Sequence, residues 1–341
     1  MIVRNAVLFC VLVLVCLTVS IGYLSADKPL AVIWAGSDLQ GEGRDGTVLF
    51  KLLDAVRSDG HRTVDEALFL GDYSSAYDTA RSEEGIGIVR DCLNRGLGLD
   101  AEEILFLQGN HDPAETEGLA LSGVHERQDY SVWVINEGDF PAFAEEDSAS
   151  LVRQTADALD LYLTSRTENG DMRPIFVLTH IPFHMSWRED NRYAAYLVEV
   201  LNRGAQNGLD IIVLFAHNHS DDYDSYLGGS CICLLPGDSM PIPEPTAQYG
   251  SMAYRTVTIA FTYLNAGYVC FTATGEPDEA RSCTVFSIYD GHIEIARYDV
   301  SGPHPLKHVG RESLLDGGWV PDLTTLPEKV TVYFSEKHND R

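Results

Sequence analysis

The amino-acid sequence predicts an α/β layered domain. Two patterns predict it: short apolar runs alternate with amphipathic helical spacing over the first two thirds, and the last third consists of consecutive strand-like runs. The chain has 341 residues, 45% of them hydrophobic, which is enough to bury a full core. No linker-like stretch separates the two parts. We therefore expect one domain, in which an antiparallel sheet is added to an α/β core.

The α/β core is expected to contain five strands and four helices. Short apolar runs predict the strands at residues 30–35, 67–70, 104–107, 175–178 and 211–215. Apolar residues at helical spacing predict helices at residues 47–57, 86–97, 150–165 and 193–201. This alternation is typical of a sheet with parallel strands joined by helices.

The last third is expected to form the antiparallel part. Strand-like runs occur at residues 230–235, 257–263, 268–273, 283–289 and 292–298, and turn-forming residues lie between them at 265–267 and 290–291. We place the domain at residues 27–300. Residues 301–341, rich in proline, glycine and charge, are expected to be a tail that packs on the domain or extends from it.

Residues 1–26 form a separate segment. Arg4 precedes an uncharged, strongly apolar run from residue 6 to residue 24, and Ser25 and Ala26 offer small side chains for cleavage. The run is close to the roughly 20 residues that span a bilayer. It is therefore either a cleaved signal peptide or an N-terminal membrane anchor. Both interpretations place the rest of the chain outside the cytoplasm, as a secreted or membrane-anchored protein.

The amino-acid composition limits the kinds of partner that the protein is expected to bind. The formal net charge of −27 disfavours nucleic acid and anionic membrane surfaces and suits a small ligand bound at one local site. Of seven cysteines, five follow the N-terminal segment, and their spacing matches no zinc motif. Free core thiols and a disulfide both remain open for Cys92, Cys231, Cys233, Cys270 and Cys283. Nothing in the sequence indicates an oligomeric state.

Polar side chains that can bind metal follow each of the five expected strands. In chain order they are Asp38 and Gln40, then Asp72, then Asn110 and His111, then His180, and finally His217 and His219. Ligands of open α/β sheets bind at the carboxyl ends of the strands. Each residue taken singly has a structural interpretation, such as a helix cap, a turn or a core histidine. Their recurrence at one sheet edge favours a metal site.

The residue types indicate the metal. Carboxylate, amide and imidazole groups without cysteine suit Mn, Fe or Zn. The set exceeds what one ion needs. Two ions roughly 3.5–4 Å apart, sharing one carboxylate, clamp a phosphoryl group and activate water near neutral pH.

The motif order D-x-Q, G-D, G-N-H-D, T-H and A-H-x-H resembles the calcineurin-like metallophosphoesterase superfamily over residues 30–298. The resemblance implies a four-layer α/β/β/α sandwich of two mixed β-sheets. It also implies a phosphoesterase that hydrolyses phosphomonoesters or phosphodiesters with two divalent ions. A hydroxide bridging the two ions would attack phosphorus in such an enzyme.

The resemblance also implies a role for each residue. Asp38 and His219 would bind the first ion, with Gln40 standing where many members have a histidine. Asp72 would bridge both ions. The second ion would be completed by Asn110, His180 and His217, while His111 would be no ligand and would assist the leaving group. The amide of Gln40 favours a hard ion such as Mn²⁺.

Departures from the family pattern define the alternatives. Because Gln40 replaces a histidine ligand, the chain could instead be a binding protein that keeps the fold but has lost catalysis. A membrane-anchored scaffold is a further alternative. Ala216 replaces the usual glycine of the last motif and is tolerable only with a negative φ. Weaker candidates for substrate contact or support are His184, Trp187, Arg188, Arg44 and Asp112, the last either orienting His111 or capping a following helix.

Overall fold

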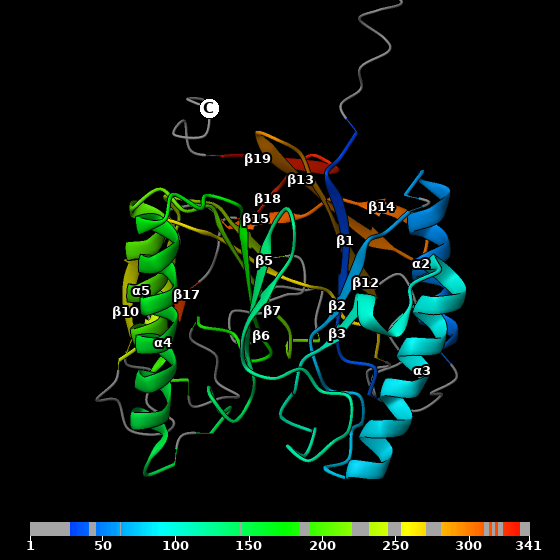
Figure 1. Cartoon of the computed structure of the whole chain (residues 1–341), viewed down its shortest axis with the longest axis horizontal. Helices are drawn as coiled ribbons and strands as arrows, with labels where there is room; N and C mark the ends of the chain where they lie inside the picture. The colour runs from blue at the N-terminus through cyan, green and yellow to red at the C-terminus, as the bar shows by residue number, and fades with distance from the viewer. Residues whose placement is uncertain are drawn as a thin grey trace, which may run out of the picture.

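The fold comes from a computed structural model. It describes residues 28–40, 46–61, 63–143, 145–184, 191–219, 232–244, 254–270, 281–309, 314–315, 318–319 and 323–334. Within these ranges the chain forms an α/β fold with four α-helices and two large mixed β-sheets that lie side by side (Figure 1). The predicted α/β class is confirmed.

The first sheet is built around β1, which is buried along its whole length. Its strands are β1 (Ala31–Gly36), β2 (Glu66–Phe69), β3 (Ile104–Phe106), β12 (Ser282–Ile288), β13 (His292–Asp299), β14 (Gly302–His304) and β19 (Lys329–Tyr333). β1, β2 and β3 are parallel neighbours, and β12 pairs antiparallel with the other edge of β1. Three successive carboxyl ends therefore meet at one edge of this sheet.

The second sheet repeats this arrangement. Its strands are β4 (Gly123–Glu126), β5 (Ser131–Ile135), β6 (Ile175–Thr179), β7 (Ile211–Phe215), β8 (Ile232–Leu234), β11 (Thr262–Asn265), β15 (Lys307–Val309) and β18 (Leu323–Thr325). β5, β6, β7 and β11 are parallel neighbours in that order. Two small hairpins lie outside the two sheets: β9 (Ser239–Pro243) with β10 (Tyr254–Thr258), and β16 (Leu314–Leu315) with β17 (Gly318–Trp319).

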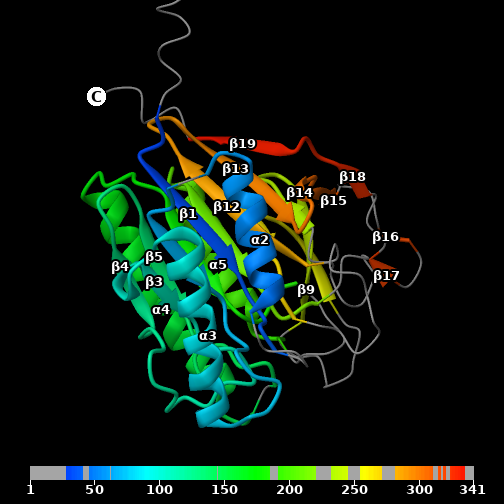
Figure 2. The ribbon, with the colours of Figure 1, turned by 90° about the vertical axis from the view of Figure 1, so that its right-hand side faces the viewer.

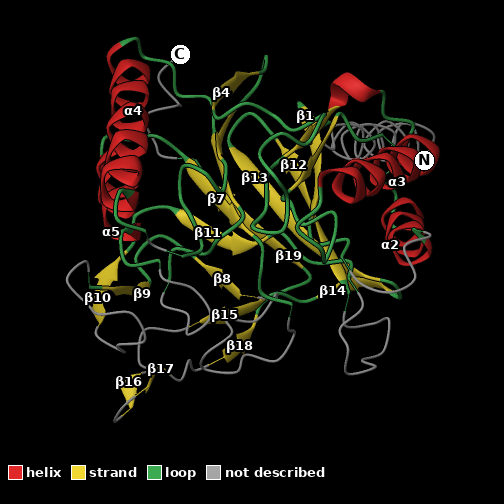
Figure 3. Ribbon diagram, turned by 90° about the horizontal axis from the view of Figure 1, so that it is seen from below, coloured by secondary structure: helices red, strands yellow, loops and turns green. Residues whose placement is uncertain are grey.

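The helices cover the outer faces of the sheets. They are α2 (Thr47–Ser58), α3 (Thr79–Leu97), α4 (Ser148–Glu168) and α5 (Ala194–Gln206), with a 3₁₀ turn, η1, at Ala101–Glu103. α2 and α3 lie in front of the first sheet in Figure 2. Seen along the sheets, α4 and α5 lie on one side and α2 and α3 on the other, with the strands between them (Figure 3). The order of layers is helix, sheet, sheet, helix.

Alternating side chains on each strand divide the core between these layers. Trp34 of β1 points to the cluster shared with α2 and α3, whereas Ile33 points to the cluster between the two sheets. Phe176 of β6 and Phe286 of β12 meet edge to face in that central cluster, with ring centroids 5.2 Å apart. A third cluster lies between the second sheet and α4 and α5. Both sheets are therefore buried on both faces, which explains their unbroken apolar runs.

One predicted helix begins earlier than its apolar periodicity indicated. The prediction started at residue 86, but α3 starts at Thr79, because the side chain of Asp78 accepts a hydrogen bond from the backbone N–H of Arg81 at 3.0 Å. The helix ends at Gly98, whose φ of 78° is left-handed. The buried positions of its first two turns are Ser82 and Gly85, so they carry no large apolar stripe for a sequence pattern to detect.

The expected separate antiparallel sheet is wrong. The late strands enter the two large sheets instead: β12 pairs with β1, and β11 pairs parallel with β7. The predicted strand at 257–263 is interrupted, because the backbone N–H groups of Ile259 and Ala260 bond to Asp238 and Asn202 rather than to a ladder. Residues 268–270 are not a strand, and 271–273 lie outside the described residues. β4 and β5 were not predicted.

The last part of the chain joins both large sheets. Residues after 300 contribute β14 and β19 to the first sheet and β15 and β18 to the second. The N-terminal apolar segment lies outside the described residues. Within the part of the chain that the structure describes, no helix is long and apolar enough to cross a membrane.

Candidate metal centre

Loops at the carboxyl ends of β1, β2, β3, β6 and β7 bring the sequence-predicted ligands together. Two groups of side chains have ligand atoms within 4.8 Å of one another, and both could hold a metal ion. The first group consists of Asp38, Asp72 and His219, and the second consists of Asp72, His180 and His217. Asp72 belongs to both groups. A single carboxylate therefore lies between two clusters of donors, as the sequence predicted for a bridging ligand.

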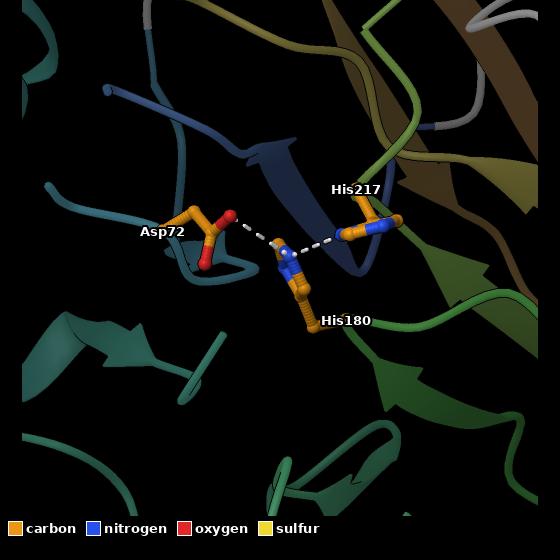
Figure 4. A group of neighbouring side chains, drawn as sticks. All are labelled: Asp72, His180 and His217. Carbon is orange, nitrogen blue, oxygen red and sulfur yellow. Dashed lines mark hydrogen bonds and ion pairs between the residues drawn. The ribbon is translucent and has the colours of Figure 1, made fainter. Parts of the chain in front are cut away.

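The group formed by Asp72, His180 and His217 is buried, and Figure 4 shows its three side chains pointing toward one another. His180 Nε2 lies 3.3 Å from Asp72 Oδ2 and 3.3 Å from His217 Nδ1. The other ring nitrogen, Nδ1, lies 2.6 Å from the carbonyl oxygen of Leu70, which fixes the imidazole so that Nε2 faces the cluster. Asn110 adds an oxygen 2.8 Å from His217 Nδ1. Four donors from four loops thus converge.

The group around Asp38 is the more open of the two. His219 Nε2 lies 2.8 Å from Asp38 Oδ1, and its side chain is 17% exposed. The amide of Gln40 lies between the groups, with Nε2 at 2.9 Å from Asp72 Oδ2 and 3.1 Å from His219 Nε2. Rotation about the terminal bond of Gln40 exchanges its nitrogen and oxygen, so this side chain can present Oε1 to a cation.

Backbone strain is concentrated at these ligands. Among the described residues, the non-glycine residues with left-handed backbone are Asp38, Asp72 and His217, with φ of 55°, 57° and 70°. Such conformations cost of order 1–3 kcal/mol each and persist only where the surroundings over-determine them. All three lie two or three residues after the end of a parallel strand, in the loops that carry the other candidate ligands.

The turn at His217 is the tightest of the three. The N–H of Asn218 donates to the carbonyl oxygen of Ala216 at 2.8 Å, which closes a three-residue turn around His217. The N–H of His217 itself lies 3.3 Å from Asp38 Oδ2. Ala216 is not among the residues with positive φ, so the condition for tolerating alanine in the motif is met.

Glycine 109 permits the close approach of two ligand loops. A Cβ atom at Gly109 would lie 2.2 Å from Asp72 Oδ1 and 2.5 Å from the backbone nitrogen of Asp72. Any side chain there would push the shared carboxylate away from its partners. The glycine of G-N-H-D is thus explained by packing against Asp72.

The electrostatics of the centre favour bound cations. Burial alone would raise the pKa of Asp38, but the neighbouring His219 and His180 lower it. Asp72 shows the same balance, and His180 lowers its pKa far below the usual range. Burial would lower the pKa of His180, but Asp72 and Asp38 outweigh it and raise that pKa to about 9. Asp38 and Cys270 likewise raise the pKa of His219 well above its ordinary value, against the effect of burial.

His111 lies at the rim of the same centre. Its backbone N–H donates to Asp72 Oδ1 at 2.9 Å, and its residue is only partly buried. A charge on its imidazole would lower the pKa of Asp72, which places the ring near the shared carboxylate. Asp112 neither orients this ring nor caps a following helix. Its side chain is buried and accepts hydrogen bonds from the backbone of Asp72 and Tyr73 at 2.7 and 3.1 Å.

Sequence reasoning missed a wall of the site formed by residues 267–270. The ring of Tyr268 stacks on His219 with centroids 5.9 Å apart, and Val269 donates its N–H to the carbonyl oxygen of Ser37 at 3.0 Å. The hydroxyl of Ser37 contacts both the carbonyl oxygen of Gly267 and the carboxylate of Asp38. The only available signal was Gly267, whose φ of 103° requires glycine and was interpreted as a hairpin turn.

The weaker candidates have different outcomes. His184 is buried in the core, with Nδ1 2.8 Å from the hydroxyl of Tyr263 and its ring edge-on to Phe215, so it does not line the metal centre. Arg44, Trp187 and Arg188 lie outside the described residues. The described cysteines are buried thiols that form no disulfide with one another, and Cys231 lies outside the described residues; the four are Cys92, Cys233, Cys270 and Cys283.

No family model matches this chain, and no curated protein matches it either.

Proposed function

We propose that the chain is an extracytoplasmic, metal-dependent phosphoester hydrolase of the calcineurin-like metallophosphoesterase kind. The observation that carries the proposal is the concentration of left-handed, non-glycine backbone at three ligand positions, Asp38, Asp72 and His217. Strain of this kind gathers at functional sites. The layer order of the fold and the order of the motifs along the chain support the same family.

The donor set fits two divalent ions, with Mn²⁺ favoured. Asp38, Gln40 and His219 would hold one ion, Asn110, His180 and His217 the other, and Asp72 both. Asp38 and Asp72 are fully buried, and within the described part of the chain neither forms an ion pair with lysine or arginine. When bound, the two ions would act as Lewis acids toward a phosphoryl oxygen and supply a water-derived nucleophile near neutral pH.

The chain's own residues position the reaction. His180 is oriented by the carbonyl oxygen of Leu70, and His217 is held by the strained turn at its own backbone. His111 is the proton donor to the leaving oxygen in this proposal. Its backbone N–H is bound to Asp72 Oδ1, which keeps His111 next to the ions that Asp72 would share and the phosphoester that they would bind.

The substrate is a small phosphomonoester or phosphodiester rather than nucleic acid. The net charge of −27 disfavours polyanions, while two dications would attract one phosphoryl group locally. The apolar N-terminal segment supports secretion or membrane anchoring, and it lies on the sequence outside the proposed catalytic domain.

The chain from residue 27 onward tests the proposal. Bound metals are counted by elemental analysis, and matched generic mono- and diester substrates are assayed with Mn²⁺, Zn²⁺ or chelator. Two ions per chain and chelator-sensitive hydrolysis are expected. Metal without hydrolysis of any substrate would favour the degenerate binding protein, and Gln40→His would then test whether the missing imidazole is the cause.

A further inference from the structure

The carboxylate of Asp112 binds four hydrogen-bond donors. Oδ2 accepts from the backbone N–H of Asp72 at 2.7 Å and of Gly109 at 3.0 Å. Oδ1 accepts from the backbone N–H of Tyr73 at 3.1 Å and from the hydroxyl of Ser82 at 2.9 Å. The side chain is fully buried. A buried carboxylate with this many donors is held rigidly and holds its donors in turn.

The three backbone donors belong to two different ligand loops, and the fourth donor, Ser82, lies in α3. Asp72 and Tyr73 follow β2, whereas Gly109 precedes Asn110 after β3, so one side chain joins the loops that deliver the shared ligand and a second-group ligand. The connection is reciprocal, because Asp72 Oδ1 accepts the backbone N–H of His111 at 2.9 Å. The carboxylates of Asp112 and Asp72 therefore each accept hydrogen bonds from the other's loop, and these bonds hold the two loops together.

The hydrogen bonds to Asp112 also account for the left-handed backbone of Asp72. Its φ of 57° turns the N–H into the protein interior, where Asp112 Oδ2 accepts it at 2.7 Å. A return to extended backbone would break this bond and rotate the Asp72 carboxylate away from His180. The strain at Asp72 is therefore offset by interactions that need no metal.

We propose that Asp112 is a positioning residue that holds Asp72 in its left-handed, metal-ready conformation before any ion binds. This inference rests on the proposed function, since it assigns Asp112 a role in loading the same metal centre. Asp112 touches neither metal nor substrate in this role. It acts through the backbone of its two neighbouring loops, as outer-shell partners of metal ligands commonly do.

The test uses the full chain, Asp112→Asn, and Ser82→Ala as the matched control. Asparagine keeps the shape of Asp112 but replaces one acceptor oxygen with an NH₂ group. Because both oxygens of Asp112 accept hydrogen bonds, this NH₂ group faces hydrogen-bond donors in either orientation of the amide. Ser82→Ala removes one of the four bonds and leaves all three bonds to the ligand loops. Mn²⁺ affinity is measured on metal-free protein by titration, and the melting temperature of the metal-free protein is recorded for each variant.

We expect Asp112→Asn to weaken Mn²⁺ binding by roughly 10–100-fold, and Ser82→Ala by no more than about threefold. A purely structural role predicts a lower melting temperature with unchanged Mn²⁺ affinity, and that result would overturn the inference while leaving the proposed function intact. A wild-type chain that binds no Mn²⁺ would overturn both.

Amide hydrogen exchange provides a second measurement that does not depend on a variant folding. If Asp112 organises the loops beforehand, the amides of Asp72, Tyr73 and Gly109 are protected in metal-free wild-type protein. The inference would be contradicted if these amides exchanged as fast as those of an open loop and became protected only after Mn²⁺ was added. The two loops would then be ordered by the metal and not by Asp112.

Discussion

At the amino ends of the parallel strands, acidic side chains are paired with arginine, whereas at the carboxyl ends they are paired with histidine. Glu66, at the start of β2, is buried against Arg127 and accepts from the hydroxyl of Tyr130 at 2.5 Å. Asp171, just before β6, pairs with Arg166 at 2.9 Å and with Arg173 at 2.6 Å. The same sheets thus neutralise acidic charge differently at their two edges.

The difference lies in whether the positive charge can be exchanged. A guanidinium stays protonated under all ordinary conditions and keeps its partner permanently satisfied. Imidazole can release its proton, and the same nitrogen can then bind a metal ion. At the carboxyl edge, Asp72 and Asp38 raise the pKa values of His180 and His219, so these imidazoles carry protons that bound dications would replace. Replaceable counter-charge distinguishes a candidate ligand centre from a structural ion pair.

The strongest way to break the comparison is Asp72→Asn. Loss of the shared carboxylate should leave less than one ion per chain and reduce phosphoester hydrolysis by about 10³-fold. A loss of this size exceeds the roughly 10–100-fold typical of an outer-shell partner, because a ligand itself is removed. Elemental analysis and steady-state assays on the same preparation provide both numbers.

The matched control is the same chemical change at the other edge. Glu66→Gln should keep wild-type metal content but lower the free energy of unfolding by about 1–3 kcal/mol, because it weakens buried bonds to Arg127 and Tyr130. Denaturant titration measures this loss. Equal metal depletion in both variants would mean that the two edges are not functionally distinct.

His111→Gln separates catalysis from metal binding at the carboxyl edge. Because His111 is a proton donor and not a ligand in the proposal, we expect turnover to fall by roughly 10²-fold while both ions remain bound. The kcat and the metal content are measured together. Unchanged turnover would remove His111 from the proposed mechanism.

The exchangeable charge has a pH signature. The folded-state pKa of His180, about 9, lies above the ordinary value of about 6.5, so its proton stabilises the metal-free fold fully below about pH 6.5. This stability is lost as pH rises through about 9. Mn²⁺ must displace the proton, so its apparent affinity should rise by about tenfold per pH unit for each proton released in that window.

Mn²⁺ titrations and denaturant unfolding at pH 6.5, 7.5 and 8.5 check both trends. The metal-free protein should become less stable with rising pH, while Mn²⁺ binding becomes tighter. An affinity that does not change across this range would show that no imidazole proton is exchanged for metal.

The smallest expected effect is that of Gln40→His. An imidazole at this position would face Asp72 and His219 and add a stronger donor for Zn²⁺ than an amide oxygen. We expect Zn²⁺ to bind several-fold more tightly, with little change for Mn²⁺, as measured by competition titration. Equal gains for both ions would mean that the amide of Gln40 does not set metal preference.

The proximity of the candidate ligands was predictable because each follows a buried strand, and the carboxyl ends of parallel strands share an edge. The backbone that aims them was not predictable. Aspartate and histidine both tolerate the left-handed region, but they adopt it at few positions, and at His217 hydrogen bonds from Asn218 to Ala216 and from His217 to Asp38 hold the turn. The role of Asp112 was also hidden, since its four donors come from three separate segments of the chain.

The fold shows the same limit. Local periodicity predicted most of the early strands and helices, but it missed β5, a five-residue strand, although the turn-forming residues Asn136 and Gly138 follow it. The neighbours of each late strand could not be predicted, because their pairing joins distant parts of the chain. β11 beside β7 and β12 beside β1 are decided by packing against both sheets, and not by nearby sequence.

The pairing of β1 with β12 has a consequence for synthesis. Ala31 lies opposite Ile288, so the first strand made on the ribosome waits for one of the last before its edge is hydrogen-bonded. Until then the nascent chain carries an apolar strand with an open side, although the segments that bear His180 and His219 have already been made. Closure of the first sheet around β1 therefore belongs after the synthesis of β12, late in the production of the chain.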